Sequence, residues 1–397
     1  RSCNGLPLDD SLTGMSATAM LASEDAASIT VYPQYQSFWY GTPGDVFTAD
    51  IRQKEWDAPR PITRLRHTEA ANEYLFTDAM FTLNPTETSN AYVAGTRMTI
   101  GTTGSNAARF VNNLAESWNL RARYREKLSD IFTTFLSVRY NDEITYVNGG
   151  VLGYFDPSSL VYRFEEDGTG EFSESAFNPI DAEAVNPTML TKRQRYTATG
   201  TLAAYWTEDS TQVTRVHLEA VSDVRRFGDD LSDHESVDLI IPQFNLTDHW
   251  SLLRAELDHE TALPWARLEL RGHVARYSAE KGGSALENSG LETGARGRLD
   301  LLLGPVSLSG FAALDYAFDQ TALSLGAGGE LPLGTFALWG GVSFSPRIRS
   351  LLLTGYRPSL LITAGDRTPD LDKVSIAEGG LRLTTLPLQL DLRGFIR

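Results

Sequence analysis

Charged side chains alternate with apolar residues along several segments of the sequence. Over residues 265–277, alternate positions hold Arg267, Glu269, Arg271 and His273, and the positions between them are apolar or glycine. The same split recurs over residues 291–303 and 388–397. A strand directs successive side chains to opposite faces, so each segment would present one charged and one apolar face. Rings of charged side chains set selectivity in pores, so this pattern points to the passage of polar solutes.

The strands that would carry these faces are long, and the connections between them alternate in length. The alternating segments run for about ten to thirteen residues, which is longer than typical soluble strands and close to the length that crosses a bilayer at a tilt. Short turns such as 304–305 and 386–387 alternate with longer links such as 141–194 and 222–249. Short turns at one rim and long loops at the other are typical of outer-membrane barrels.

The pattern predicts an all-β fold, a closed antiparallel up-and-down transmembrane β-barrel. The fourteen strands that we expect lie at 73–83, 90–100, 115–125, 131–140, 195–206, 212–221, 250–259, 265–277, 290–303, 306–318, 321–331, 335–345, 376–386 and 388–397. Two more segments, Val237 to Phe244 and Leu351 to Ile362, would raise the count to sixteen. Residues 72–397 would form the barrel, and residues 1–71 an N-terminal segment that plugs its lumen as a plug or hatch.

Composition narrows the classes of protein that fit. Mean hydropathy is −0.23, and no run of eighteen apolar residues is present, which argues against membrane helices but not against a barrel. A net charge of −16 argues against nucleic acid as a partner. The lone cysteine, Cys3, excludes a disulfide framework within the chain and a cysteine-rich metal site.

No catalytic or cofactor-binding constellation stands out. The six histidines are scattered, and neither a His-Glu-x-x-His nor a Gly-x-Ser-x-Gly motif occurs. Residues 167–171 lack the ligand spacing of a calcium loop. We therefore expect no enzyme activity, no catalytic residues, no metal and no cofactor.

Residues 72–141 and 195–397 resemble the barrels of bacterial outer-membrane porins and TonB-dependent receptors. The segments Trp118–Tyr124 and Phe135–Tyr140 have sequences typical of strands in such barrels. Residues 14–28 are similar to the N-terminal hatch of the long-chain fatty-acid transporter family, although Tyr32-Pro33-Gln34 stands where that family has Asn-Pro-Ala. The terminal Phe395-Ile396-Arg397 departs from the barrel-assembly signal, which ends on an aromatic residue, and leaves open that the chain continues. The resemblance implies a bacterial outer-membrane location.

If the apolar faces meet lipid, the polar faces line the lumen. The predicted lumen-lining residues are Arg121, Arg123, Arg125, Arg139, Arg254, Glu256, Asp258, Arg267, Glu269, Arg271, His273, Arg296, Arg298, Asp300, Asp315, Arg382, Asp391 and Arg393. The long link 141–194 carries Glu165, Glu166, Asp167, Glu171 and Glu174, and it is either an ordinary acidic surface loop or a constriction loop that folds inward. Opposed arginines and carboxylates would then orient dipolar solutes at a constriction.

Three hypotheses about function stay open. The first is an outer-membrane channel that passes small polar or anionic solutes. The second is an occluded barrel that acts as a scaffold or docking partner in an envelope assembly, with charges that only pair across a filled interior. The third is a transporter of hydrophobic substrates with an N-terminal hatch. The expected partners are outer-membrane lipid and small solutes, with a second copy or another envelope protein left open.

The orientation of the faces is testable with spin labels in a lipid bilayer. We expect labels at positions 268 and 299 to report lipid, and labels at 267 and 298 to report water or protein, because a strand directs neighbouring side chains to opposite faces. Accessibility to oxygen and to a polar nickel chelate distinguishes these environments. The reverse result would exchange the lumen and lipid faces.

Overall fold

The computed structural model describes most of the chain, and each statement below concerns the residues it describes. These are residues 2–3, 6–7, 25–40, 48–54, 60–70, 74–100, 115–146, 154–156, 161–163, 189–229, 245–281, 288–317, 319–347, 371–385 and 388–396. The predicted strands at 237–244 and 351–362 and the predicted loop carboxylates at 165, 166, 167, 171 and 174 lie outside these ranges. Across them, no helix is both long and apolar enough to cross a membrane.

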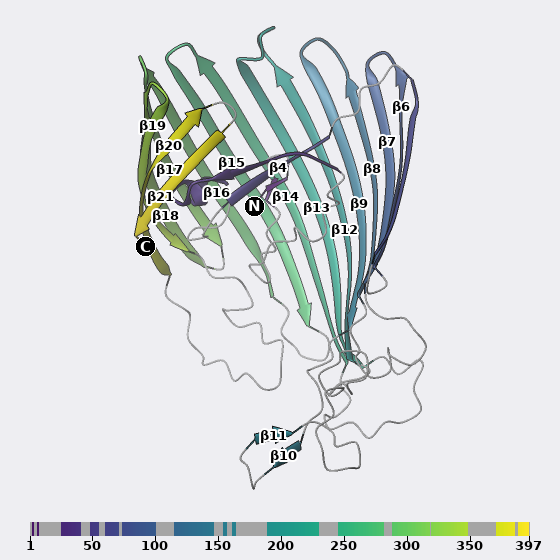
Figure 1. Cartoon of the computed structure of the whole chain (residues 1–397). Coiled ribbons are helices and arrows are strands. Elements are labelled where there is room, and N and C mark those ends of the chain that lie inside the picture. Colours follow the sequence, from purple (N-terminus) through teal and green to yellow (C-terminus); the bar gives the residue numbers. More distant parts are fainter. Residues whose placement is uncertain are drawn as a thin grey trace.

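One large antiparallel sheet curls around a central space (Figure 1). Its fifteen strands follow the order of the chain, and each pairs antiparallel with the next. They are β5 (Ile62–Ala70), β6 (Tyr74–Thr86), β7 (Ser89–Ile100), β8 (Ala115–Lys127), β9 (Phe132–Tyr146), β12 (Met189–Tyr205), β13 (Gln212–Asp229), β14 (Asn245–Leu263), β15 (Ala266–Lys281), β16 (Asn288–Leu303), β17 (Val306–Ala317), β18 (Gln320–Leu333), β19 (Phe336–Arg347), β20 (Asp372–Thr385) and β21 (Leu388–Ile396). The outermost strands, β5 and β21, are not hydrogen-bonded to each other within the described ranges. The prediction of an all-β, antiparallel, up-and-down barrel fold is confirmed.

Short turns lie at one rim of the sheet, at the top of Figure 1, and most of the longer connections at the other. Two of these turns need a left-handed backbone and place glycine there, Gly304 at φ 62° and Gly334 at φ 67°. The long connection after β9 contains a small hairpin of β10 (Tyr154–Asp156) and β11 (Val161–Arg163). The predicted sorting of short and long connections is therefore confirmed.

All fourteen predicted strands are present in the large sheet, but several are longer than predicted and one strand of this sheet was missed. β12 to β15 extend several residues further toward the rim of long connections, where pairing continues through polar residues that show no alternation. The missed strand is β5, which lies within the range 1–71. Its outward positions hold His67 and Glu69 beside Leu65, so both of its faces are polar and the apolar stripe is lost.

The N-terminal segment lies inside the curve of the large sheet (Figure 1). It contains a small sheet in the order β2-β1-β4-β3, made of β1 (Ser2–Cys3), β2 (Leu6–Pro7), β3 (Ala26–Tyr32) and β4 (Thr48–Gln53). A 3-10 turn, η3 (Gln34–Gln36), leads directly into one helical turn, α1 (Ser37–Tyr40). Trp39 and Phe38 of α1 are among the most deeply buried side chains described. Part of the barrel's core is thus supplied by this segment.

Two belts of polar and aromatic side chains border the apolar outer surface. Near the rim of short turns, Trp206 packs edge-on against Phe132, with ring centroids 6.3 Å apart, and its Nε1 donates to Thr214 Oγ1 at 2.8 Å. Near the other rim, Trp118 Nε1 donates to a Glu116 carboxylate oxygen at 3.2 Å. Exposed leucines and valines occupy the surface between the belts. Aromatic girdles at both interfaces are a hallmark of membrane barrels.

The outer surface predicts how a charge is tolerated at different depths. Leu253 lies midway along β14 with 62% of its surface exposed, and Leu263 ends the same strand with 45% exposed. We expect Leu253→Arg to lower the free energy of unfolding by about 2–4 kcal/mol and Leu263→Arg by about 0–1 kcal/mol, because arginine is costly only near the bilayer midplane. Denaturant unfolding in lipid vesicles measures both. Equal costs would show that position 253 does not face the lipid core.

Candidate functional site: the charged inner face

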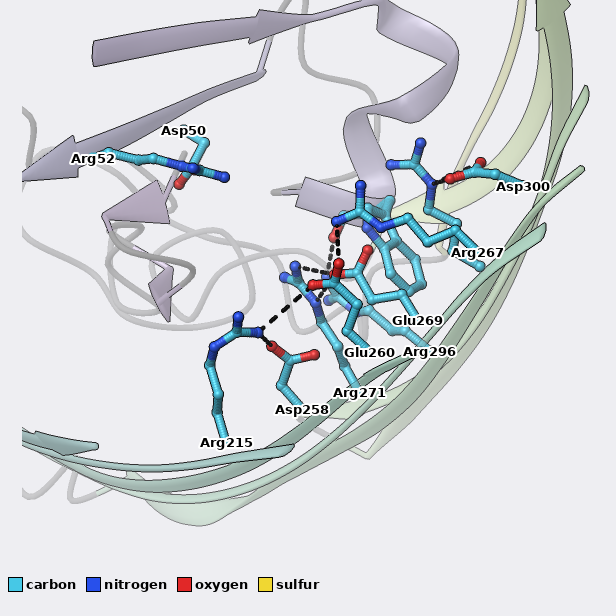
Figure 2. Close-up of polar contacts among 12 residues, drawn as sticks. Asp50, Arg52, Arg215, Asp258, Glu260, Arg267, Glu269, Arg271, Arg296 and Asp300 are labelled. Carbon is cyan, nitrogen blue, oxygen red and sulfur yellow. Dashed lines mark hydrogen bonds and ion pairs between the residues drawn. The ribbon is translucent and has the colours of Figure 1, made fainter. Parts of the chain in front are cut away.

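The inner face of the sheet holds buried charges where the outer face holds exposed apolar residues. On β14, Arg254, Glu256 and Asp258 are 6%, 9% and 7% exposed, whereas the intervening Leu257 is 53% exposed. Figure 2 shows such side chains pointing from the sheet toward the N-terminal segment. The period-two pattern therefore separates the two environments as the sequence predicted.

Most of the predicted lumen-lining residues have side chains on this inner face. Each is assigned to this face by its own burial or ion pairs, or because it is paired across strands with a residue that has them. They are Arg121, Arg123, Arg125, Arg139, Arg254, Glu256, Asp258, Arg267, Glu269, Arg271, His273, Arg296, Arg298, Asp300, Asp315 and Arg382. The side chains of Asp391 and Arg393 on β21 lie outside the described part of the chain. Whether any of these residues lines a conducting path stays a prediction.

A ladder of ion pairs runs across β13, β14 and β15 (Figure 2). Arg215 pairs with Asp258 at 3.0 Å and with Glu260 at 3.8 Å, and Arg267 reaches Glu260 from the other side at 2.8 Å. These side chains are only partly buried: Arg215 is 30% and Arg267 is 49% exposed. Because they remain in reach of water, they could contact a polar solute in the lumen.

Deeper charges pair with one another more completely. Arg254 reaches Glu219 at 3.3 Å and Glu292 at 3.8 Å, and its side chain is only 5% exposed. Further along the wall, Arg296 pairs with Asp315 at 3.2 Å. A buried charge is stable only with a partner, and here the antiparallel register supplies it from the same or a nearby strand. This pairing agrees with the hypothesis of charges that compensate one another in a filled interior.

Another part of the inner face, formed by β6, β7 and β8, binds the N-terminal segment through Asp25. The Asp25 carboxylate forms an ion pair with Arg121, 2.8 Å from Nε, accepts a hydrogen bond from the Tyr92 hydroxyl at 2.6 Å, and lies 3.7 Å from Arg123. The carbonyl oxygen of Asp25 also accepts the backbone N–H of Lys54 at 2.7 Å. We call this group of contacts the Asp25 anchor. It joins a segment close to the N-terminus to strands about a hundred residues further along the chain.

Asp78 of β6 supports the Asp25 anchor from within the wall. It is fully buried and accepts from Arg121 at 2.7 Å, from Arg64 at 3.0 Å and from Thr96 at 2.7 Å. Arg121, with a side chain 2% exposed, therefore bridges two carboxylates. A single arginine shared in this way fixes the position of Asp25 relative to the wall.

The segment contacts a third region of the wall through aromatic side chains. Trp39, fully buried, has Arg271 stacked 5.4 Å from its ring centroid, and its carbonyl oxygen accepts Arg296 Nη1 at 3.3 Å. Tyr35 is 5% exposed, and burial raises the pKa of its phenol, so the ring stays neutral against the wall. The N-terminal segment is thus held from both sides of the lumen.

Several of these residues were missed from the sequence. Asp25 and Trp39 lie in a stretch with no periodicity, so no local signal marks them. Asp78 does lie on one face of the predicted strand 73–83, where counting single carboxylates would have found it. Asp223 accepts Arg193 Nε at 2.9 Å, but it lies two residues beyond the predicted strand 212–221 and was found only because β13 continues to Asp229.

Comparison with known proteins adds information about the fold. No protein-family model matches the chain, and no curated protein is significantly similar to it in sequence. Solved structures do match it in shape. The copper transporter OprC aligns with a TM-score of 0.70 and 12% identity over 99% of this chain and 62% of that one.

Two receptors align in the same way. A mutant of the ferric enterobactin receptor PfeA from Pseudomonas aeruginosa matches with a TM-score of 0.69 and 13% identity, over 99% of this chain and 62% of that one. The siderophore receptor PirA from Acinetobacter baumannii matches with a TM-score of 0.66 and 10% identity, over 99% and 61%. The chain has the fold of a bacterial outer-membrane β-barrel. It spans less than two thirds of the length of these proteins.

The buried arginine of the Asp25 anchor predicts a loss of stability. We expect Arg121→Met to lower the free energy of unfolding by about 3–5 kcal/mol, because it leaves the buried carboxylates of Asp25 and Asp78 without their shared cation. Arg97→Met is the matched control: Arg97 lies on the outer face with a side chain 52% exposed and pairs with Glu116, so its loss should cost under about 1 kcal/mol. Urea unfolding of both variants in vesicles measures this difference, and equal costs would contradict the assigned role of Arg121.

Proposed function

We propose that this chain belongs to an outer-membrane transporter for polar solutes, whose passage the N-terminal segment closes. The observation that carries the proposal is the position of residues 25–40 and 48–54: they lie inside the curve of the sheet and are tied to it on both sides, by the Asp25 anchor and by Trp39 (Figure 1). A solute can pass only when this segment moves.

The inner face supports a polar solute rather than an apolar one. In the ladder, Arg215, Glu260 and Arg267 offer both signs of charge on partly exposed side chains. Such groups can replace the hydration of a polar or anionic solute one contact at a time. A hydrophobic substrate would instead have to cross paired charges, so the inner face disfavours the fatty-acid-transporter hypothesis.

The matched structures support transport at a coarser level. The three proteins are a copper transporter, a ferric enterobactin receptor and a siderophore receptor, and none of the three is described as an enzyme. We carry over the general activity, solute uptake across the outer membrane, as part of this proposal. The contacts between the N-terminal segment and the wall also support the scaffold hypothesis, so the test must separate movement of the segment from conduction.

Asp25→Asn tests the proposal in single-channel recordings of the full chain in planar bilayers. The substitution keeps the shape of the side chain but removes its charge, and a hydrogen bond to a charged group contributes about 1.5–3 kcal/mol. We expect openings to become about 10- to 100-fold more frequent than in the unaltered chain, because each 1.4 kcal/mol changes a population tenfold.

Asp50→Asn is the matched control for that substitution. It removes the same charge from the same segment, and the 3.9 Å ion pair of Asp50 with Arg52 lies within one strand. It should leave the opening frequency unchanged. If protease digestion shows that the segment is released in folded Asp25→Asn and no conductance appears, the transport proposal fails and the scaffold hypothesis holds.

A further inference from the structure

The inner wall of β18 and β19 lacks side chains where the N-terminal segment touches it. Gly326, Gly328 and Gly341 face inward there. A Cβ added at Gly328 would lie 2.4 Å from the ring of Tyr35, and one at Gly341 would lie 2.5 Å from the same ring. A Cβ at Gly326 would lie 3.0 Å from the ring of Phe38. We call these three glycines the glycine socket, because any larger residue at 328 or 341 would fill the space of Tyr35.

The aromatic side chains that fill the socket form one group, which we call the aromatic latch: Tyr35, Phe38 and Trp39. They are 5%, 1% and 0% exposed. All three rings surround Phe311 of β17, with centroids at 6.1, 6.3 and 6.4 Å, two of them edge-on. They complete a buried cluster whose other members, Trp339 among them, come from the wall. The side chains of the segment therefore fill the volume that is left free by the glycines of the wall.

Polar contacts at the edge of the socket set the position of the latch. The backbone N–H of Tyr35 donates to Glu378 of β20 at 3.4 Å, and Glu378 is 7% exposed. Arg296 holds the carbonyl oxygen of Trp39 at 3.3 Å. Wall residues thus fix the backbone of the latch at its first residue, Tyr35, and at its last, Trp39.

Glycine at these positions has a cost that the wall could avoid. Glycine inside a strand weakens the sheet, since it adds backbone entropy to the unfolded chain and has no side chain to pack. Two of these glycines, Gly328 and Gly341, face each other directly across β18 and β19. A wall built only for stability would carry larger residues here. Close approach of another backbone or ring is the usual reason for such a site, and Tyr35 provides that approach.

The latch and the Asp25 anchor hold one segment by different chemistry. The anchor is ionic and buried among β6, β7 and β8, whereas the latch is apolar and lies on β17 to β20, far around the barrel (Figure 1). Release of Asp25 leaves Arg121 facing a single carboxylate, whereas release of the latch exposes three aromatic rings and ends the contacts of Tyr35 with Glu378 and of Trp39 with Arg296. The two attachments can therefore be weakened separately, by a charge change at the anchor or by a steric change at the socket.

We propose that the glycine socket and the aromatic latch form an autoinhibitory contact, the point at which the N-terminal segment detaches to open the lumen. This inference rests on the proposed function, in which the segment closes a transport path. It makes Gly326, Gly328 and Gly341 a gating surface, with a role beyond strand packing.

A spin label reports detachment without requiring conduction. Val31 of β3 lies between Asp25 and Tyr35 and is 52% exposed, and Cys3 is the chain's single cysteine, so Cys3→Ser with Val31→Cys gives one labelling site. In this background, Gly328→Ala should raise the mobile fraction of the label about tenfold or more, because overpacking forces the ring of Tyr35 out.

Tyr35→Ala should also release the label. Adding Gly328→Ala to Tyr35→Ala should then change nothing further, since the colliding ring is gone.

Gly310→Ala is the matched control. It adds the same methyl group to the neighbouring strand β17, where no atom lies within 4 Å of the new Cβ, so the label should stay immobile. The heat-induced mobility shift in gels shows that each variant is folded. If the label stays immobile in both folded Gly328→Ala and Tyr35→Ala, the latch proposal is overturned. A mobile label without single-channel openings supports the latch and overturns the transport proposal instead.

Discussion

The structure depends on the need to pair every backbone N–H and C=O group where no water is available. Lipid offers the backbone no hydrogen-bonding partner, so a chain that crosses it with strands must form one continuous antiparallel sheet. That sheet then imposes its period of two on the side chains. On β14, Leu253 and Leu257 face outward while Arg254, Glu256 and Asp258 face inward. The separation of charge from lipid follows from the backbone geometry alone.

The same sheet creates a second requirement inside it. Charges confined to the inner face of a curved wall lose much of their hydration and must find partners. Cross-strand register provides many of these, as between Arg254 and Glu219 on paired strands. Other partners come from the N-terminal segment, where Asp25 pairs with Arg121. The interior is therefore a polar network in which the segment is one member.

The N-terminal segment combines two kinds of attachment with different physical consequences. An ion pair between buried groups is specific in position and costly to break. Aromatic rings packed against glycine are held by shape complementarity and by burial. In the proposed function, the segment closes the lumen and detaches when a solute passes, and one attachment of each kind is compatible with both states. This division gives the glycine residues of β18 and β19 a function that their sequence context alone does not suggest.

Strands and their faces were determined by local sequence, whereas partnerships across the lumen were decided by tertiary structure. The alternation over residues 265–277 and similar segments predicted fourteen strands, because period two is a local property of the chain. β5 escaped that analysis since His67 and Glu69 make its outer face polar as well, and only pairing with β6 identifies it as a strand. Asp25 and Tyr35 carry no periodic signal. Their roles arise from contacts with residues about a hundred and about three hundred positions away, which only the closing of the sheet around the segment brings together.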